Sequence, residues 1–170
     1  MPEKFRQLSP GRRTAAISLS LLIVLTLAFI FGNSLDDRQE SAQKSAQFER
    51  IVEPVLRALP YDQLHTREAL ATVTRKLAHY AEFFLLGAQM TALAILTRQV
   101  LPVRKRCILL SCLVIACADE LLQFVSLRAP QVQDALLDTF GALCGILFVH
   151  GVYRLLSGLR DAASKGGAHA

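Results

Sequence analysis

The chain has 170 residues, of which 52% are hydrophobic, and a formal net charge of +5. This length suits a single domain, residues 1–170. The hydrophobic residues form four long blocks and do not recur at the periods typical of half-buried helices and strands, which argues against a soluble globular protein. The basic residues flank those blocks and serve membrane topology, which argues against a nucleic-acid partner. The composition indicates a small membrane protein.

Four membrane-spanning helices are predicted in chain order, at about residues 14–32, 77–97, 107–125 and 132–156. Each block is close to the roughly 20 apolar residues that a helix needs to cross a hydrocarbon core about 30 Å thick. The first block is longer than the apolar part of a typical secretion signal and lacks a small-x-small cleavage site, so we expect it to be retained. We therefore predict an all-α integral membrane bundle of four transmembrane helices in a lipid bilayer.

The segment between the first two spans, residues 33–76, is long and rich in charge. Part of it places apolar residues at helical spacing with charges on the other face. These apolar residues are Phe48, Val52, Val55 and Leu59. Pro54 is expected to kink or restart this helix. We therefore predict an amphipathic helical segment that lies on the membrane surface or caps the bundle. Residues from about 161 to 170 are predicted to form a disordered tail.

The distribution of lysine and arginine predicts the orientation of the spans. The N-terminal tail, the loop at residues 98–106 and the C-terminal tail are rich in basic residues and lie on one side of a four-span protein. Cytoplasmic loops carry an excess of these residues, so both termini are expected in the cytoplasm. Basic residues in the 33–76 segment are spread among acids over a longer loop. The amphipathic segment is therefore expected to be extracytoplasmic.

Polar side chains gather at the predicted extracytoplasmic ends of spans two, three and four. At 100° per residue, His79 and Glu82 fall on one face of span two, and span four carries two carboxylates one turn apart. The set in chain order is Arg75, Lys76, His79, Glu82, Asp119, Glu120, Gln123, Arg128, Asp134 and Asp138. An aspartate near mid-bilayer costs about 2.5–3.5 kcal/mol on insertion scales. These groups are therefore expected to face one another or a wet cavity.

Two interpretations of this polar set remain open. Ionisable residues within a membrane can pair simply to fix helix register, and Arg75 and Lys76 can also extend to lipid headgroups. The carboxylates outnumber the fixed cations, however, so the surplus must be protonated, hydrated or matched by an external partner. Gly141 and Gly145 continue the polar stripe of span four, and small residues four apart let a neighbouring helix approach closely. The stripe is therefore expected to face protein.

Each polar residue has a candidate role. Carboxylates beside a histidine can act as general acid and base, or can hold a divalent cation against a phosphate headgroup. The residues assigned to this catalytic role are His79, Glu82, Asp119, Glu120, Asp134 and Asp138. Cationic and amide side chains can instead bind a substrate through its phosphate oxygens. The residues assigned to substrate binding are Arg75, Lys76, Gln123 and Arg128. A divalent cation is a candidate cofactor, but no spacing in the sequence identifies a metal.

Several stretches resemble the VanZ-like family of small membrane proteins. They read "RKLAHYAEFFLLG", "DELLQFVSLR" and "RAPQVQDALLDTFGALCG", and the serine-rich "NSLDDRQESAQKS" follows the first span. The resemblance runs from about Phe29 to Gly145 and rests on the order and spacing of these motifs. Phe83 departs from the family pattern, in which an aromatic hydroxyl is expected after the glutamate. The resemblance implies a bacterial inner-membrane protein tied to the cell envelope, and the founding member is associated with teicoplanin resistance.

Three functions are compatible with this sequence. The first is a protein that binds or acts on an envelope lipid or a lipid-linked precursor at its outer site, with an effect on glycopeptide susceptibility. No residue stands out as a nucleophile, which weakens the interpretation as an enzyme. Whether the protein is catalytic is left open. The second is a non-catalytic membrane scaffold or binding protein. The third is a proton-coupled carrier, because carboxylates and histidine within spans can relay protons, although the inner half of every span looks dry. We prefer the first.

Overall fold

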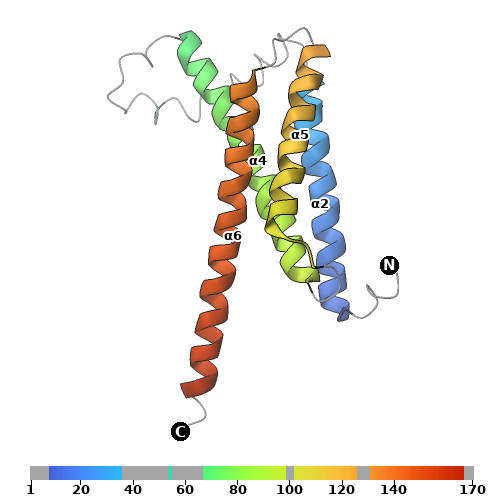
Figure 1. Ribbon diagram of the computed structural model, residues 1–170, viewed down its shortest axis with the longest axis vertical. Helices are drawn as coiled ribbons and strands as arrows, with labels where there is room; N and C mark the ends of the chain where they lie inside the picture. Colours follow the sequence, from blue (N-terminus) through green and yellow to red (C-terminus); the bar gives the residue numbers. More distant parts are fainter. Residues whose placement is uncertain (1–7, 36–53, 55–66, 99–101, 126–130, 167–170) are drawn as a thin grey trace.

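The computed structural model describes residues 8–35, 54, 67–98, 102–125 and 131–166, which form four long helices (Figure 1). These helices are α2 (Pro10–Leu35), α4 (Arg67–Thr97), α5 (Lys105–Val125) and α6 (Val132–Gly166). Successive helices run in opposite directions, so α2 begins and α6 ends toward the same end of the bundle (Figure 1). No strand occurs among the described residues. The predicted all-α bundle of four helices is confirmed.

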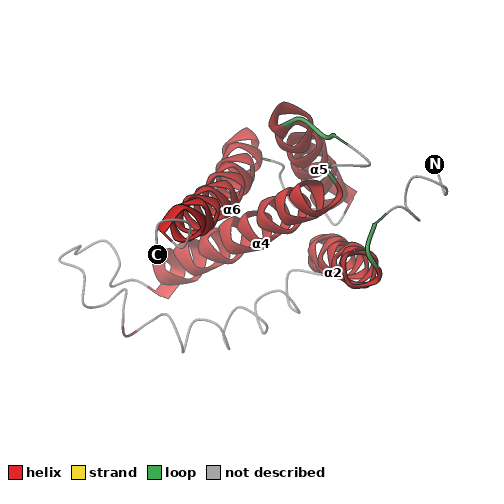
Figure 2. Cartoon of the chain, turned by 90° about the horizontal axis from the view of Figure 1, so that it is seen from below, coloured by secondary structure: helices red, strands yellow, loops and turns green. Residues whose placement is uncertain are grey.

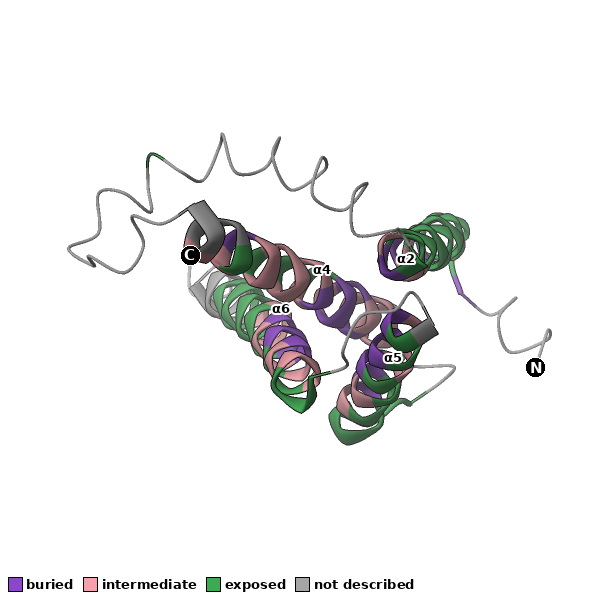
Figure 3. Ribbon diagram, turned by 90° about the horizontal axis from the view of Figure 1, so that it is seen from above, coloured by how far each residue is buried: buried purple, intermediate pink, exposed green. Residues whose placement is uncertain are grey.

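Each helix is long and apolar enough to cross a membrane. The candidate spans are Pro10–Leu35, Thr72–Thr97, Lys105–Phe124 and Val132–Arg160. Exposed residues lie on the outside of the bundle, and buried ones on the facing sides of the helices (Figure 3). Many of the exposed side chains are large and apolar, including Leu25 at 65% and Leu121 at 68% exposure. Soluble proteins rarely expose so much apolar surface, whereas a lipid bilayer covers it.

Two helices are longer than the spans predicted from hydrophobicity. α4 begins at Arg67, inside the segment predicted as a loop, and α6 continues to Gly166, past the predicted start of a disordered tail. The added residues include alanine, leucine, glutamate, arginine and lysine, which favour helix. Hydrophobicity determines where a helix meets lipid, whereas helix propensity and capping determine where it ends. The predicted amphipathic segment lies outside the described residues.

The starts of α2 and α6 follow from local sequence. Pro10 occupies the first helical position, where its missing N–H costs nothing, and the Ser9 carbonyl accepts a hydrogen bond from the Arg13 N–H at 3.0 Å. The Gln131 carbonyl accepts from the Asp134 N–H at 2.9 Å, so α6 begins directly after Gln131. Asp134 lies in the first turn of α6, where the helix dipole favours a negative charge. This start places the acidic residues of α6 at the end of the bundle where α2 and α5 end (Figure 1).

Helix α4 lies at the centre of the bundle and contacts the other three helices, most extensively α6 (Figure 2). Glycines permit this approach. A Cβ added to Gly145 would lie 2.1 Å from the Phe84 carbonyl oxygen, and one added to Gly141 would lie 2.5 Å from that of Tyr80. Gly87 of α4 makes a matching approach to α6. The prediction that the glycine stripe of span four faces protein is confirmed.

A buried apolar core fills the space between the helices. It consists of Ile30, Phe83, Leu86, Ile108, Cys112, Ala116, Ala142 and Ile146. Phe83, the departure from the family pattern, is fully buried in this core. Beside it, the Gln89 amide donates to the Thr26 hydroxyl at 3.0 Å, which joins α2 to α4 through buried polar groups. This packing holds the ends of the helices, and the polar residues they carry, in fixed positions.

Candidate functional site

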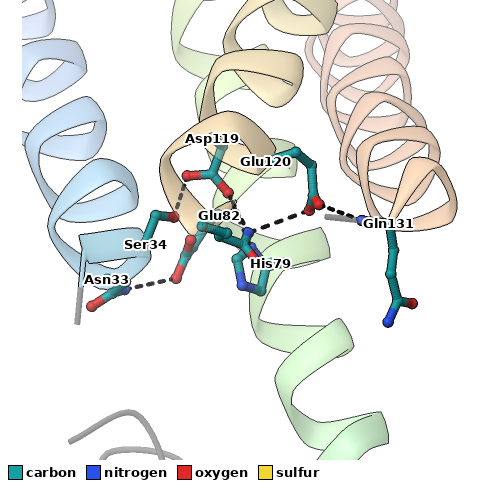
Figure 4. A network of polar contacts seen from close by, with 8 residues as sticks. Asn33, Ser34, His79, Glu82, Asp119, Glu120 and Gln131 are labelled. Carbon is teal, nitrogen blue, oxygen red and sulfur yellow. Dashed lines mark hydrogen bonds and ion pairs between the residues drawn. The ribbon is translucent and has the colours of Figure 1, made fainter. Parts of the chain in front are cut away.

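Polar side chains from α2, α4 and α5 meet at the end of the bundle where α2 and α5 end (Figure 4), and α6 adds Asp134 and Asp138. We call this set the polar cluster. Its members are Asn33, Ser34, Lys76, His79, Glu82, Asp119, Glu120, Gln123, Asp134 and Asp138. The burial of so many ionisable groups is costly unless they satisfy one another or bind something. The contacts of each carboxylate show which of these conditions it meets.

Asp119 of α5 is fully buried and joins three helices. Its Oδ1 accepts a short hydrogen bond from the Ser34 hydroxyl at the end of α2 (Figure 4). Its Oδ2 accepts from the Gln123 amide at 3.0 Å and lies 3.9 Å from Nδ1 of His79 on α4. The distance of 3.9 Å is within ion-pair range but too long for a hydrogen bond. Asp119 is therefore held from two sides, with the imidazole facing it.

Glu120 is also buried, and both of its oxygens have donors within the protein. Oε2 accepts from the backbone N–H of Gln131 at 2.7 Å, and Oε1 accepts from the Gln123 amide at 3.3 Å (Figure 4). The first bond ties α5 to the residue that starts α6. This pattern is what a positioning residue requires, because the carboxylate fixes the approach of two helices.

The two carboxylate oxygens of Glu82 on α4 have different surroundings. Its Oε1 accepts from the Asn33 amide at 3.2 Å, whereas Oε2 is buried and has no hydrogen-bond partner among the described residues. The same side chain contributes to the wall of a groove of about 380 Å³ between α2 and α4. The groove is lined by Leu25, Thr26, Phe29, Ala81, Glu82 and Leu85. Glu82 thus belongs both to the polar cluster and to a largely apolar groove.

The basic residues predicted to bind substrate have different surroundings. Lys76 forms an ion pair with Asp134, so its charge is already directed to a partner within the protein. Arg75 lies near enough to Glu120 for their charges to interact. Arg128 lies outside the described residues. The cluster therefore keeps a surplus of acidic groups, as the sequence indicated.

Asp138 of α6 is the most unusual member of the polar cluster. It is fully buried, and within the part of the chain that the structure describes neither of its carboxylate oxygens has a hydrogen-bond partner. Four other carboxylates, Glu82, Asp119, Glu120 and Asp134, are close enough to act on it electrostatically. A buried, unpaired carboxylate costs several kcal/mol, so Asp138 requires a proton, a cation or a ligand.

Three side chains of the cluster could hold a metal ion together. His79, Asp119 and Asp138 each offer one ligand atom, and these atoms lie within 4.8 Å of one another. They come from α4, α5 and α6, respectively. The spacing of these residues along the chain matches no metal-binding pattern, so only the packing of the three helices reveals the group.

Two members of the cluster, Asn33 and Ser34, were missed by sequence reasoning. Both were assigned to the loop after the first span, although they are in the last turns of α2. A signal was present, since they open the "NSLDDRQESAQKS" stretch that resembles the family. The candidate site is therefore built from four helices and not from the three that were predicted.

Four apolar helices around a buried polar cluster define a small polytopic membrane protein. A protein-family model described as VanZ/LLP1 matches residues 19–156, which include parts of all four helices. The chain belongs to the VanZ/LLP1 family, as the motifs predicted. Searches of curated proteins and of solved structures found no match.

Proposed function

We propose that this protein binds a lipid of the bacterial envelope, or a lipid-linked envelope precursor, at the polar cluster. One observation carries the proposal: Glu82 belongs to the polar cluster and also lines the groove between α2 and α4. A lipid needs polar and apolar surfaces side by side. Its headgroup would contact the cluster, and one acyl chain would lie in the groove.

The groove suits an acyl chain that arrives from the bilayer. Leu25, Phe29 and Leu85 line it and are 65%, 59% and 48% exposed, so its wall is continuous with the lipid-facing surface. Its volume of about 380 Å³ falls in the range of small-molecule sites, about 300–1,000 Å³. A chain can enter sideways between α2 and α4 without leaving the hydrocarbon phase.

The chemistry of the cluster favours a headgroup that offers hydrogen-bond donors. Oε2 of Glu82 and both oxygens of Asp138 have no hydrogen-bond partner among the described residues, and they can accept from hydroxyl or amine groups. The basic residues at the edge, Arg75 and Lys76, could approach phosphate oxygens. We infer that the cluster faces the extracytoplasmic leaflet, on the distribution of basic residues. Binding of an envelope precursor there would change its exposure to glycopeptide antibiotics, including teicoplanin.

Native mass spectrometry of the protein purified in mild detergent tests this function. Wild-type protein mixed with extracted bacterial membrane lipids is expected to retain one lipid class. Ala81→Trp fills the groove and Glu82→Gln removes a charge, and both should reduce retention of that class. Leu121→Trp is the matched control, because Leu121 is 68% exposed on α5 and does not line the groove.

Two results would overturn the proposal. One is an unselective lipid mixture on the wild-type protein, as expected for a membrane scaffold without a lipid site. The other is equal retention of a single class by wild-type protein, both groove variants and the control. Appearance of a chemically altered lipid would add catalysis to binding.

A further inference from the structure

We propose that His79, Asp119 and Asp138 form a binding site for a divalent transition-metal ion, Mn²⁺ or Zn²⁺. One ligand comes from each of α4, α5 and α6, and the three ligand atoms lie within 4.8 Å of one another. All three residues lie inside the bundle, with Asp119 and Asp138 fully buried. The role of this ion in headgroup binding rests on the proposed function, whereas ion binding by itself does not.

The close packing of α4 on α6 brings two of the ligands together. Tyr80 follows His79 directly, and Gly141 comes one turn after Asp138. A Cβ at Gly141 would lie 2.5 Å from the Tyr80 carbonyl oxygen, so these backbones approach closely at this point. This approach brings ligand atoms of the His79 imidazole on α4 and the Asp138 carboxylate on α6 to within 4.8 Å of each other. Asp119 reaches the same place from α5.

Asp138 supplies the second, independent observation. Its two oxygens are fully buried, and in the described part of the chain no donor satisfies either of them. Lys76, the lysine of the polar cluster, already pairs with Asp134. A buried carboxylate that has no hydrogen-bond partner among the described residues, and that lies beside a second carboxylate and an imidazole, has surroundings suited to a metal ligand.

The donor set selects the class of metal. Mg²⁺ and Ca²⁺ prefer ligands that are all oxygen, whereas an imidazole with carboxylates suits Zn²⁺, Mn²⁺ and related ions. Zn²⁺ lies about 2.0–2.2 Å from nitrogen and oxygen ligands, so tetrahedral ligands are about 3.4 Å apart. Side-chain rotation would have to bring the atoms closer by up to about 1.4 Å. Three protein ligands leave a coordination position open, as in catalytic sites.

Other members of the cluster would orient the ligands. Ser34 and Gln123 donate to the two oxygens of Asp119. A carboxylate oxygen has two lone pairs, so each can accept a hydrogen bond and still bind an ion. Such hydrogen bonds around a metal ligand commonly change metal affinity by about 10–100-fold when they are removed. Ser34 and Gln123 are therefore positioning residues for this site.

The ion would also remove a difficulty in headgroup binding. The cluster has more acidic than basic groups, and a phosphate brought into it would be repelled. A divalent cation offsets that charge, and its open position can take a phosphate oxygen. The lipid class that fits best is then one with a phosphate in its headgroup.

Metal binding can be measured on the full-length, tag-free protein after chelator treatment. Electron paramagnetic resonance of added Mn²⁺ should show one bound ion per chain, with coupling to an imidazole nitrogen. Asp138→Asn should weaken Mn²⁺ binding by more than about tenfold, and His79→Gln should abolish the nitrogen coupling. His150→Gln is the matched control, since His150 lies twelve residues, or about 18 Å along α6, from Asp138, and it should leave both signals unchanged.

Several outcomes would overturn the inference. They are no Mn²⁺ or Zn²⁺ binding by folded wild-type protein, binding that Asp138→Asn leaves unchanged, and nitrogen coupling that survives His79→Gln. Circular dichroism must show that each variant keeps its helical content. Because no lipid is added, the ion can bind when the lipid proposal fails, and lipid can bind when the metal proposal fails. The two results are therefore separable.

Discussion

Replacing Gly145 by alanine should separate α4 from α6. The added Cβ would lie 2.1 Å from the Phe84 carbonyl oxygen, and 2.9 Å from the Ala88 backbone nitrogen. Carbon–oxygen contacts are ordinarily about 3.3 Å or longer, so the helices must move apart by about 1 Å. No flexible side chain can absorb this shift, because the atoms met are backbone. Overpacking of this kind typically costs about 1–3 kcal/mol.

Thermal and denaturant unfolding in detergent micelles would measure the loss. Gly151→Ala is the matched control, because a Cβ at Gly151 on the same helix meets nothing within 4 Å. Replacing glycine by alanine inside a helix favours the helix by up to about 1 kcal/mol, so Gly151→Ala should be at least as stable as the wild-type protein. If Gly145→Ala were as stable as Gly151→Ala, the close approach of α4 and α6 would be refuted. The placement of His79 opposite Asp138 would then lose its structural basis.

Three further predictions follow from single contacts or from topology. Lys76→Met and Asp134→Asn should each lower the free energy of unfolding, because each breaks the ion pair. A double-mutant cycle should give a coupling energy of about 0.5–3 kcal/mol, and additive effects would contradict the ion pair. Thr26→Val removes a hydroxyl that accepts from a buried amide of α4 and should cost about 0.6 kcal/mol in unfolding measurements, whereas no change would contradict that bond. A reporter active only outside the cytoplasm should work when fused near Gln47 and fail after Arg160, and the reverse pattern would move the polar cluster to the inner face.

The four-helix bundle was predictable because lipid imposes a simple requirement on the chain. A spanning helix must be apolar over about 20 residues, and the four blocks satisfy this without any tertiary information. The ends of the helices were less predictable. α4 starts at Arg67 and α6 reaches Gly166 because polar residues with high helix propensity extend both helices beyond the apolar blocks.

Sequence periodicity predicted the location of the candidate site, because charges are expensive in lipid and their positions are conspicuous. Asn33 and Ser34 were missed because uncharged amide and hydroxyl groups give a weaker signal at the end of an apolar block. The sequence also could not distinguish Asp134, which pairs with Lys76, from Asp138, which has no hydrogen-bond partner in the described chain. That distinction depends on the distance between α4 and α6 and on the rotation of each helix about its own axis.

Photo-crosslinking in cells tests most directly whether the groove and the polar cluster bind a lipid. A photoreactive amino acid at position 29 would replace Phe29, which lines the groove, and one at position 124 would replace Phe124, which is 65% exposed on α5. We expect position 29 to capture one lipid class with a phosphate-containing headgroup, and Glu82→Gln to reduce that capture. Position 124 should capture the bulk membrane lipids. The same bulk mixture at both positions, unaffected by Glu82→Gln, would contradict a lipid-binding site in this protein.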